Sequence, residues 1–129
     1  MLLKIIQLSR HIRSLFCGLQ ERKEEWYLFN LQGHWKPSNI RKALIPEGYQ
    51  YNPFSTTYKG QIWTCRKLMC DGWHQIHLRF YHVDDCTIIT GHYELDPLMN
   101  PGDHLRGEGL RALDHEERLR VQWAFFRSD

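Results

Sequence analysis

The sequence predicts an α+β fold, in which an N-terminal helix packs on a curved, mainly antiparallel sheet of about five strands. Two observations predict it. Apolar residues recur with a helical period over residues 2–19, and three strand-like runs separated by short turns fill residues 61–95. The 129 residues fit a single domain, 1–129, because two domains of half that length would each bury too little surface.

The N-terminal segment has the pattern of an amphipathic helix. Its apolar residues recur at spacings of three or four, while Lys4, Arg10 and Arg13 lie off that stripe. Gly18 is near the expected end of the helix, and a charged connector follows over residues 20–25. The apolar stripe is expected to cover one face of the sheet. It consists of Ile5, Leu8, Ile12, Leu15, Phe16 and Leu19.

A strand, a short helix and a long loop are expected next. Aromatic and aliphatic residues predict a strand over residues 26–31, which Gly33 ends. Ser38 is the expected N-cap of a helix over residues 39–44, which Pro46 closes. Residues 46–57 are rich in turn-forming residues and are expected to form a loop with an edge strand at residues 49–51.

The middle of the chain predicts a three-stranded meander. The runs 61–70 and 73–82 flank Asp71-Gly72, a pair typical of a two-residue type I′ turn with positive φ at both positions. A second two-residue turn at Asp84-Asp85 leads into a strand over residues 86–95. Because side chains alternate between the faces of a sheet, these turns also fix which residues share a face.

One face of the meander is apolar nearly throughout and is the expected core face. It carries Trp63, Cys65, Ile76, Leu78, Phe80, Ile89 and Tyr93. The opposite face places Arg66 across from His77, His77 across from His92, and Gln75 across from Glu94, with Arg79 across from Thr90. The register therefore predicts that Arg66, His77, Arg79, His92 and Glu94 converge.

The C-terminal segment has two interpretations. Asp114 with Glu117 has the spacing of a capping box that opens a helix. Residues 118–125 alternate with a period of two, which places Leu119, Val121, Trp123 and Phe125 on one side. We prefer a final strand here.

The converging residues predict a site for an anionic ligand or RNA. Arg66 and Arg79 would act as forked donors to phosphate or carboxylate, and His104 and Arg106 in the following loop would cover the site. The net charge of +2 is too small to indicate nucleic acid by itself. The alternative without a ligand site is that these polar residues form the solvated face of an antiparallel sheet.

The same residues predict a catalytic alternative, a small metal-independent hydrolase or nuclease. His77 and His92 would serve as general base and general acid, and Glu94 would orient them. A metal site on His77, His92 and Glu94 is a second option, but the sequence predicts no metal and no cofactor. It has no GxSxG motif, so nucleophilic catalysis by serine is not expected. An interaction protein without a small-molecule site is the remaining alternative.

The segment Gly33-His34-Trp35-Lys36 resembles the GxW signature of lipocalin-type barrels. That resemblance implies a hydrophobic-ligand carrier, which is a further alternative.

The cellular setting is predicted from the cysteines and the N-terminus. Cys17, Cys65, Cys70 and Cys86 do not have the spacing of a disulfide scaffold, and the N-terminus lacks the features of a signal peptide. The longest apolar run is too short to cross a membrane. We therefore expect a cytoplasmic protein with no membrane contact. Edge strands of a short sheet favour a homodimer that covers them.

Overall fold

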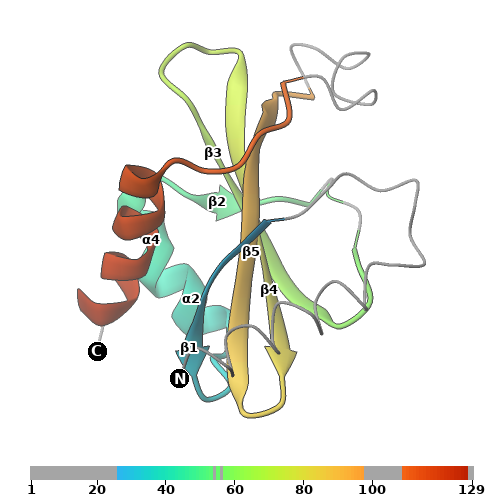
Figure 1. Ribbon diagram of the computed structural model, residues 1–129, viewed down its shortest axis with the longest axis vertical. Coiled ribbons are helices and arrows are strands. Elements are labelled where there is room, and N and C mark those ends of the chain that lie inside the picture. The colour runs from blue at the N-terminus through green and yellow to red at the C-terminus, as the bar shows by residue number, and fades with distance from the viewer. Residues whose placement is uncertain (1–25, 54, 56, 98–108, 128–129) are drawn as a thin grey trace.

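The computed structural model describes residues 26–53, 55, 57–97 and 109–127. The helix predicted over residues 2–19 and the residues His104 and Arg106 lie outside this part of the chain. The described elements make an α+β fold in which two helices accompany one five-stranded antiparallel sheet (Figure 1). The predicted fold class is therefore confirmed.

The sheet has the strand order β1-β5-β4-β3-β2. The central strands are β3 (Gln61–Leu68), β4 (His74–Val83) and β5 (Cys86–Leu95), which pair as the predicted meander. The edges are β1 (Trp26–Gln32) and the short β2 (Gln50–Tyr51), both close to their predicted positions. Because the sheet is open, the lipocalin-type architecture that the GxW resemblance implied is wrong.

The register of the meander is confirmed, but the first turn is longer than predicted. Met69 N–H donates to the His74 carbonyl at 2.9 Å, so four residues connect the strands rather than two. Of Asp71 and Gly72, only Gly72 has positive φ, at 74°. The four-residue loop 70–73 is centred on Asp71-Gly72, as the predicted two-residue turn was, so the pairing Trp63–Phe80 is unchanged.

The Asp71 carboxylate holds this loop together. It accepts the backbone N–H of Trp73 at 2.9 Å and that of His74 at 3.0 Å, and it also contacts the His74 ring. Hydrogen bonds from the His74 backbone, the Trp73 backbone and the His74 ring lower the pKa of Asp71 to about 2. The second turn is confirmed: Val83 pairs directly with Cys86 across Asp84-Asp85, and Asp84 has a φ of 53°.

Two helices pack on the predicted core face. The short helix α2 (Pro37–Leu44) continues into the 3₁₀ turn η1 (Ile45–Glu47), and the longer helix α4 (His115–Arg127) ends the described chain. Ser38 is not the N-cap of α2, because the helix begins two residues earlier than predicted, at Pro37, and Lys36 is the cap residue. Pro fits this first position, where no intrahelical bond to its nitrogen is needed.

The core joins the sheet to both helices. Six of the seven residues expected on the core face are buried, and Trp63 is partly buried. The α2 residues Ile40, Ala43 and Leu44 and the α4 residues Val121, Ala124 and Phe125 belong to the same core. Phe125 makes edge contacts with Phe29 and Trp35, at centroid distances of 6.1 and 5.2 Å.

The predicted C-terminal strand is wrong, because residues 115–127 form the helix α4. Asp114 caps it: its Oδ1 accepts the Glu117 backbone N–H at 2.8 Å. The alternation of residues 118–125 predicted a strand because Val121 and Phe125 lie an even number of residues apart. Their spacing of four also puts them on the same buried stripe of a helix. Leu119 and Trp123 share the same spacing on the exposed side.

Gly91 allows β4 and β5 to approach closely at Leu78. A Cβ on Gly91 would lie 2.6 Å from Leu78 Cδ2 and 2.9 Å from the His77 carbonyl oxygen. We expect Gly91→Ala to lower the free energy of unfolding by about 1–3 kcal/mol, the usual cost of overpacking a core. Denaturant unfolding measures this. Because the contact with the His77 backbone would remain, the double variant Leu78→Ala/Gly91→Ala should be less stable than Leu78→Ala alone. Equal stability of the two would show that only the Leu78 side chain excludes a Cβ at Gly91.

Candidate functional site

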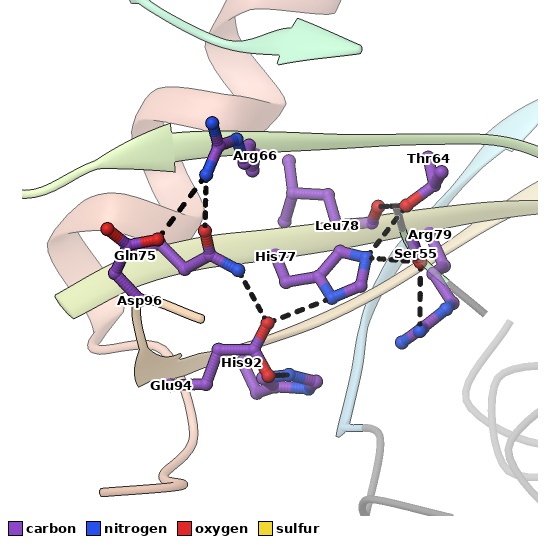
Figure 2. Close-up of polar contacts among 10 residues, drawn as sticks. All are labelled: Ser55, Thr64, Arg66, Gln75, His77, Leu78, Arg79, His92, Glu94 and Asp96. Carbon is purple, nitrogen blue, oxygen red and sulfur yellow. Dashed lines mark hydrogen bonds and ion pairs between the residues drawn. The ribbon is translucent and has the colours of Figure 1, made fainter. Parts of the chain in front are cut away.

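The candidate site lies on the sheet face opposite α2 and α4, and we call it the polar face. It consists of Thr64 and Arg66 on β3, Gln75, His77 and Arg79 on β4, and Thr90, His92 and Glu94 on β5. The pairings Arg66–His77, His77–His92, Gln75–Glu94 and Arg79–Thr90 all occur as the sequence predicted. The predicted pairings are therefore confirmed, and His77, His92 and Glu94 lie together, whereas Arg66 and Arg79 lie at opposite ends of the polar face (Figure 2).

The polar face is buried, so its interpretation as the solvated side of the sheet is wrong. Gln75, Thr90 and His92 have no exposed surface, and His77, Arg79 and Glu94 are at most 4% exposed. Only Arg66 is partly exposed. Burial removes water as a partner, so these groups depend on one another for hydrogen bonds and charge balance.

Glu94 is the centre of the cluster. Its Oε1 accepts a hydrogen bond from Gln75 Nε2 at 2.7 Å and lies 3.2 Å from His77 Nδ1. Its Oε2 lies 3.1 Å from His92 Nε2. Burial by itself would raise the pKa of Glu94, but the hydrogen bonds and charges of His77 and His92 outweigh it and hold that pKa far below its usual range. Glu94 is therefore a carboxylate.

His77 is held at both ring nitrogens. Nδ1 faces Glu94, while Nε2 lies 2.8 Å from Thr64 Oγ1 and 3.1 Å from Ser55 Oγ. Thr64 can donate its single hydroxyl proton to the Leu78 carbonyl, 3.1 Å away. In that arrangement Thr64 can only accept at Nε2, whereas Ser55 can donate there.

His92 lies on the other side of the carboxylate. Its ring makes an edge contact with that of His77, at a centroid distance of 5.5 Å, and with Trp26 of β1, at 6.3 Å. Two imidazoles thus face one carboxylate from neighbouring strands, as Figure 2 shows.

The two arginines already have partners within the chain. Arg66 contacts the Asp96 carboxylate at 3.4 Å and donates to the Gln75 amide oxygen at 3.3 Å. Arg79 lies over the Tyr58 ring, 4.0 Å from its centroid, and donates to Ser55 Oγ at 3.1 Å. Arg79 therefore points toward Ser55 and His77, while Arg66 belongs to the opposite end of the polar face.

Ser55 is the residue that sequence reasoning missed. It lies in the loop after β2, is half-buried, and contacts both His77 and Arg79. The only sequence signal at Ser55 is its membership of a turn-rich segment. Its contact with a histidine 22 residues later is a tertiary one.

The cluster also has the composition of a metal site. His77, His92 and Glu94 each place one ligand atom within 4.8 Å of the others. Two imidazole nitrogens and one carboxylate oxygen form a common set of protein ligands for zinc and non-haem iron.

Comparisons with protein families, with curated proteins and with solved structures found no match. Any function must therefore be argued from this geometry. Among the described residues, no helix is long and apolar enough to cross a membrane. Of the cysteines in this part of the chain, Cys65 is a buried and Cys70 an exposed free cysteine. The cytoplasmic location and the homodimer stay predictions.

Proposed function

We propose that the protein is a metal-independent hydrolase of small anionic esters, with Ser55 as nucleophile, His77 as general base and Glu94 as the group that orients His77. The observation that carries this proposal is a continuous chain of contacts. Ser55 Oγ lies 3.1 Å from His77 Nε2, and His77 Nδ1 lies 3.2 Å from Glu94 Oε1. A nucleophile, a base and an orienting carboxylate in this order activate a serine on several unrelated folds.

The hydrogen bonds define how the proton would move. In the resting state, His77 Nδ1–H donates to Glu94 and Nε2 accepts from Ser55. As Ser55 Oγ bonds to the electrophilic atom of the ester, its proton passes to Nε2, and the nearby Glu94 carboxylate stabilises the imidazolium. The new Nε2–H can then donate to Thr64 Oγ1, which lies 2.8 Å away. The bond from the electrophilic atom to the alcohol oxygen then breaks, and Nε2–H gives its proton to the leaving alcohol. Water, deprotonated by His77 in the same way, then attacks the adduct, the bond to Ser55 Oγ breaks, and Ser55 regains its proton from His77.

Arg79 supports an anionic substrate. Its guanidinium lies 3.1 Å from Ser55 Oγ, so its positive charge is next to the atom that attacks. A cation at this point stabilises the negative charge that develops in the transition state and attracts an anionic ester. His92 holds the second oxygen of Glu94 and is a positioning residue rather than the general acid predicted from the sequence.

Burial favours a small substrate over RNA. A nucleic acid strand needs an open groove for its backbone, whereas the polar face is buried and its most accessible contact to His77 is the half-buried Ser55. The anionic-ligand prediction is therefore retained as the substrate class of the proposed hydrolase. A protein that binds anions without turnover is the alternative that the following experiment separates.

Reaction with a fluorophosphonate probe tests the nucleophile. Ser55 Oγ would bond to phosphorus, fluoride would leave, and His77 would take the hydroxyl proton. We expect a single adduct on Ser55, identified by mass spectrometry, and its rate should fall by about 10²–10⁴-fold in His77→Gln, the usual contribution of a general base. Thr64→Val should still be labelled at Ser55.

The matched control is Ser38→Ala, which removes an exposed serine from α2 and should leave the labelling rate unchanged. Unfolding curves of each variant establish that it is folded. Absence of a wild-type adduct, or an equal rate in folded His77→Gln, would overturn the proposal. Stabilisation of the unlabelled wild type by inorganic phosphate would then favour an anion-binding protein.

A further inference from the structure

We propose that His77, His92 and Glu94 form a binding site for one divalent transition-metal ion, with Zn²⁺ as the best fit. This inference goes beyond the proposed hydrolase, which uses no metal. It rests on the geometry of three buried side chains on two paired strands. Only its last consequence, competition between the ion and serine reactivity, depends on the proposed function.

The spacing of the ligand atoms fits a coordination shell. Zinc binds imidazole nitrogen and carboxylate oxygen at about 2.0–2.2 Å, so neighbouring ligands of a tetrahedral ion lie about 3.3 Å apart. The observed distances are 3.2 Å from His77 Nδ1 to Glu94 Oε1 and 3.1 Å from His92 Nε2 to Glu94 Oε2. One ligand atom from each residue lies within 4.8 Å of the other two, so the side chains would draw together to hold an ion.

The hydrogen bonds around the cluster support its use as a metal site. Metal-binding histidines usually donate their second N–H to a fixed acceptor, which sets the tautomer. Thr64 provides that acceptor, because it lies 2.8 Å from His77 Nε2 while its own proton can go to the Leu78 carbonyl. Gln75 holds Glu94 Oε1 in the same way, at 2.7 Å.

Metal binding requires this tautomer, in place of the Nδ1–H form that donates to Glu94 in the absence of an ion. With the proton on His77 Nε2, the lone pair of Nδ1 points toward a carboxylate 3.2 Å away, and the side chains of both residues are at most 5% exposed. A metal ion bound by both atoms would take the place of the Nδ1 proton that otherwise lies between them. Two imidazoles and one carboxylate offer three ligands, which leaves a fourth zinc position open.

Metal binding and the proposed serine chemistry would exclude each other. An ion takes the Nδ1 lone pair of His77, so the proton stays on Nε2, and Nε2 can no longer accept the proton of Ser55. The ion would also take the Glu94 oxygens that stabilise the imidazolium. We therefore expect bound zinc to suppress labelling of Ser55.

Titration of the chelator-treated wild-type protein with ZnCl₂ and with CoCl₂ tests the site. Calorimetry should show one ion per chain, Co²⁺ should give the visible absorption of a four-coordinate ion, and either ion should raise the melting temperature. His92→Ala and Glu94→Gln should weaken binding by more than about 100-fold. Thr64→Val should weaken it by about 10–100-fold, as expected for loss of a supporting hydrogen bond to a ligand.

Two controls address binding elsewhere. His34→Ala removes an exposed histidine that stacks on His82, and Cys70→Ser removes the exposed thiol; both should keep wild-type affinity. Wild-type affinity in folded His92→Ala and Glu94→Gln would overturn the metal site. Unchanged Ser55 labelling at saturating zinc would overturn only the competition, and absence of labelling without metal would overturn the hydrolase while leaving the metal site standing.

Discussion

Replacement of Leu78 by alanine is expected to lower the free energy of unfolding by about 2–5 kcal/mol. Leu78 has no exposed surface and lies at the centre of the core face, between Cys65 on β3 and Gly91 on β5. Alanine would lose the transfer free energy of the buried methyl groups and leave a cavity.

Leu68→Ala is the matched control, since it makes the same chemical change at a leucine that is 55% exposed at the end of β3. It should change stability by less than about 0.5 kcal/mol. Urea unfolding, followed by circular dichroism, measures both variants. An equal effect of the two substitutions would show that the helices do not pack on the Leu78 side of the sheet.

Glu94→Leu is expected to lower the free energy of unfolding by about 3–5 kcal/mol, the usual cost of removing one partner from a buried charged cluster. Glu94 accepts from Gln75 and contacts both imidazoles, and none of these side chains has water to replace it. Glu94→Gln should cost less, because its amide oxygen can still accept from Gln75 and His77 while its amide group faces His92.

An exposed ion pair on α4 is the control for this effect. Arg120 and Glu116 are 2.8 Å apart, but their side chains are 58% and 78% exposed. Glu116→Leu should therefore cost less than about 1 kcal/mol. Guanidinium unfolding at fixed pH compares the variants. A Glu94→Leu protein as stable as wild type would mean that the polar face is not closed to water in solution.

The sequence determined the meander and the membership of both its faces. Side chains alternate along a strand, and a turn fixes the register of the strands that it joins, so the turn at Asp84-Asp85 pairs His77 with His92. The pairing of β3 with β4 survived an error in the length of the first turn, because the observed loop 70–73 has the same centre as the predicted turn. The capping-box spacing of Asp114 and Glu117 also predicts the start of α4 correctly, whereas the alternating pattern of residues 118–125 favoured a strand.

Only the tertiary structure decided that the polar face is buried rather than exposed to solvent. Alternation says which side chains share a face but not whether that face meets water, because burial depends on segments distant in sequence. Hydrogen bonds and charges of His77 and His92 keep the buried Glu94 a carboxylate, and the loop after β2 brings Ser55 to His77. The helical state of residues 115–127 also depends on tertiary packing. Val121 and Phe125 are four residues apart, a spacing that puts them on one side of either a strand or a helix, and in the folded protein they are buried in the core as part of a helix.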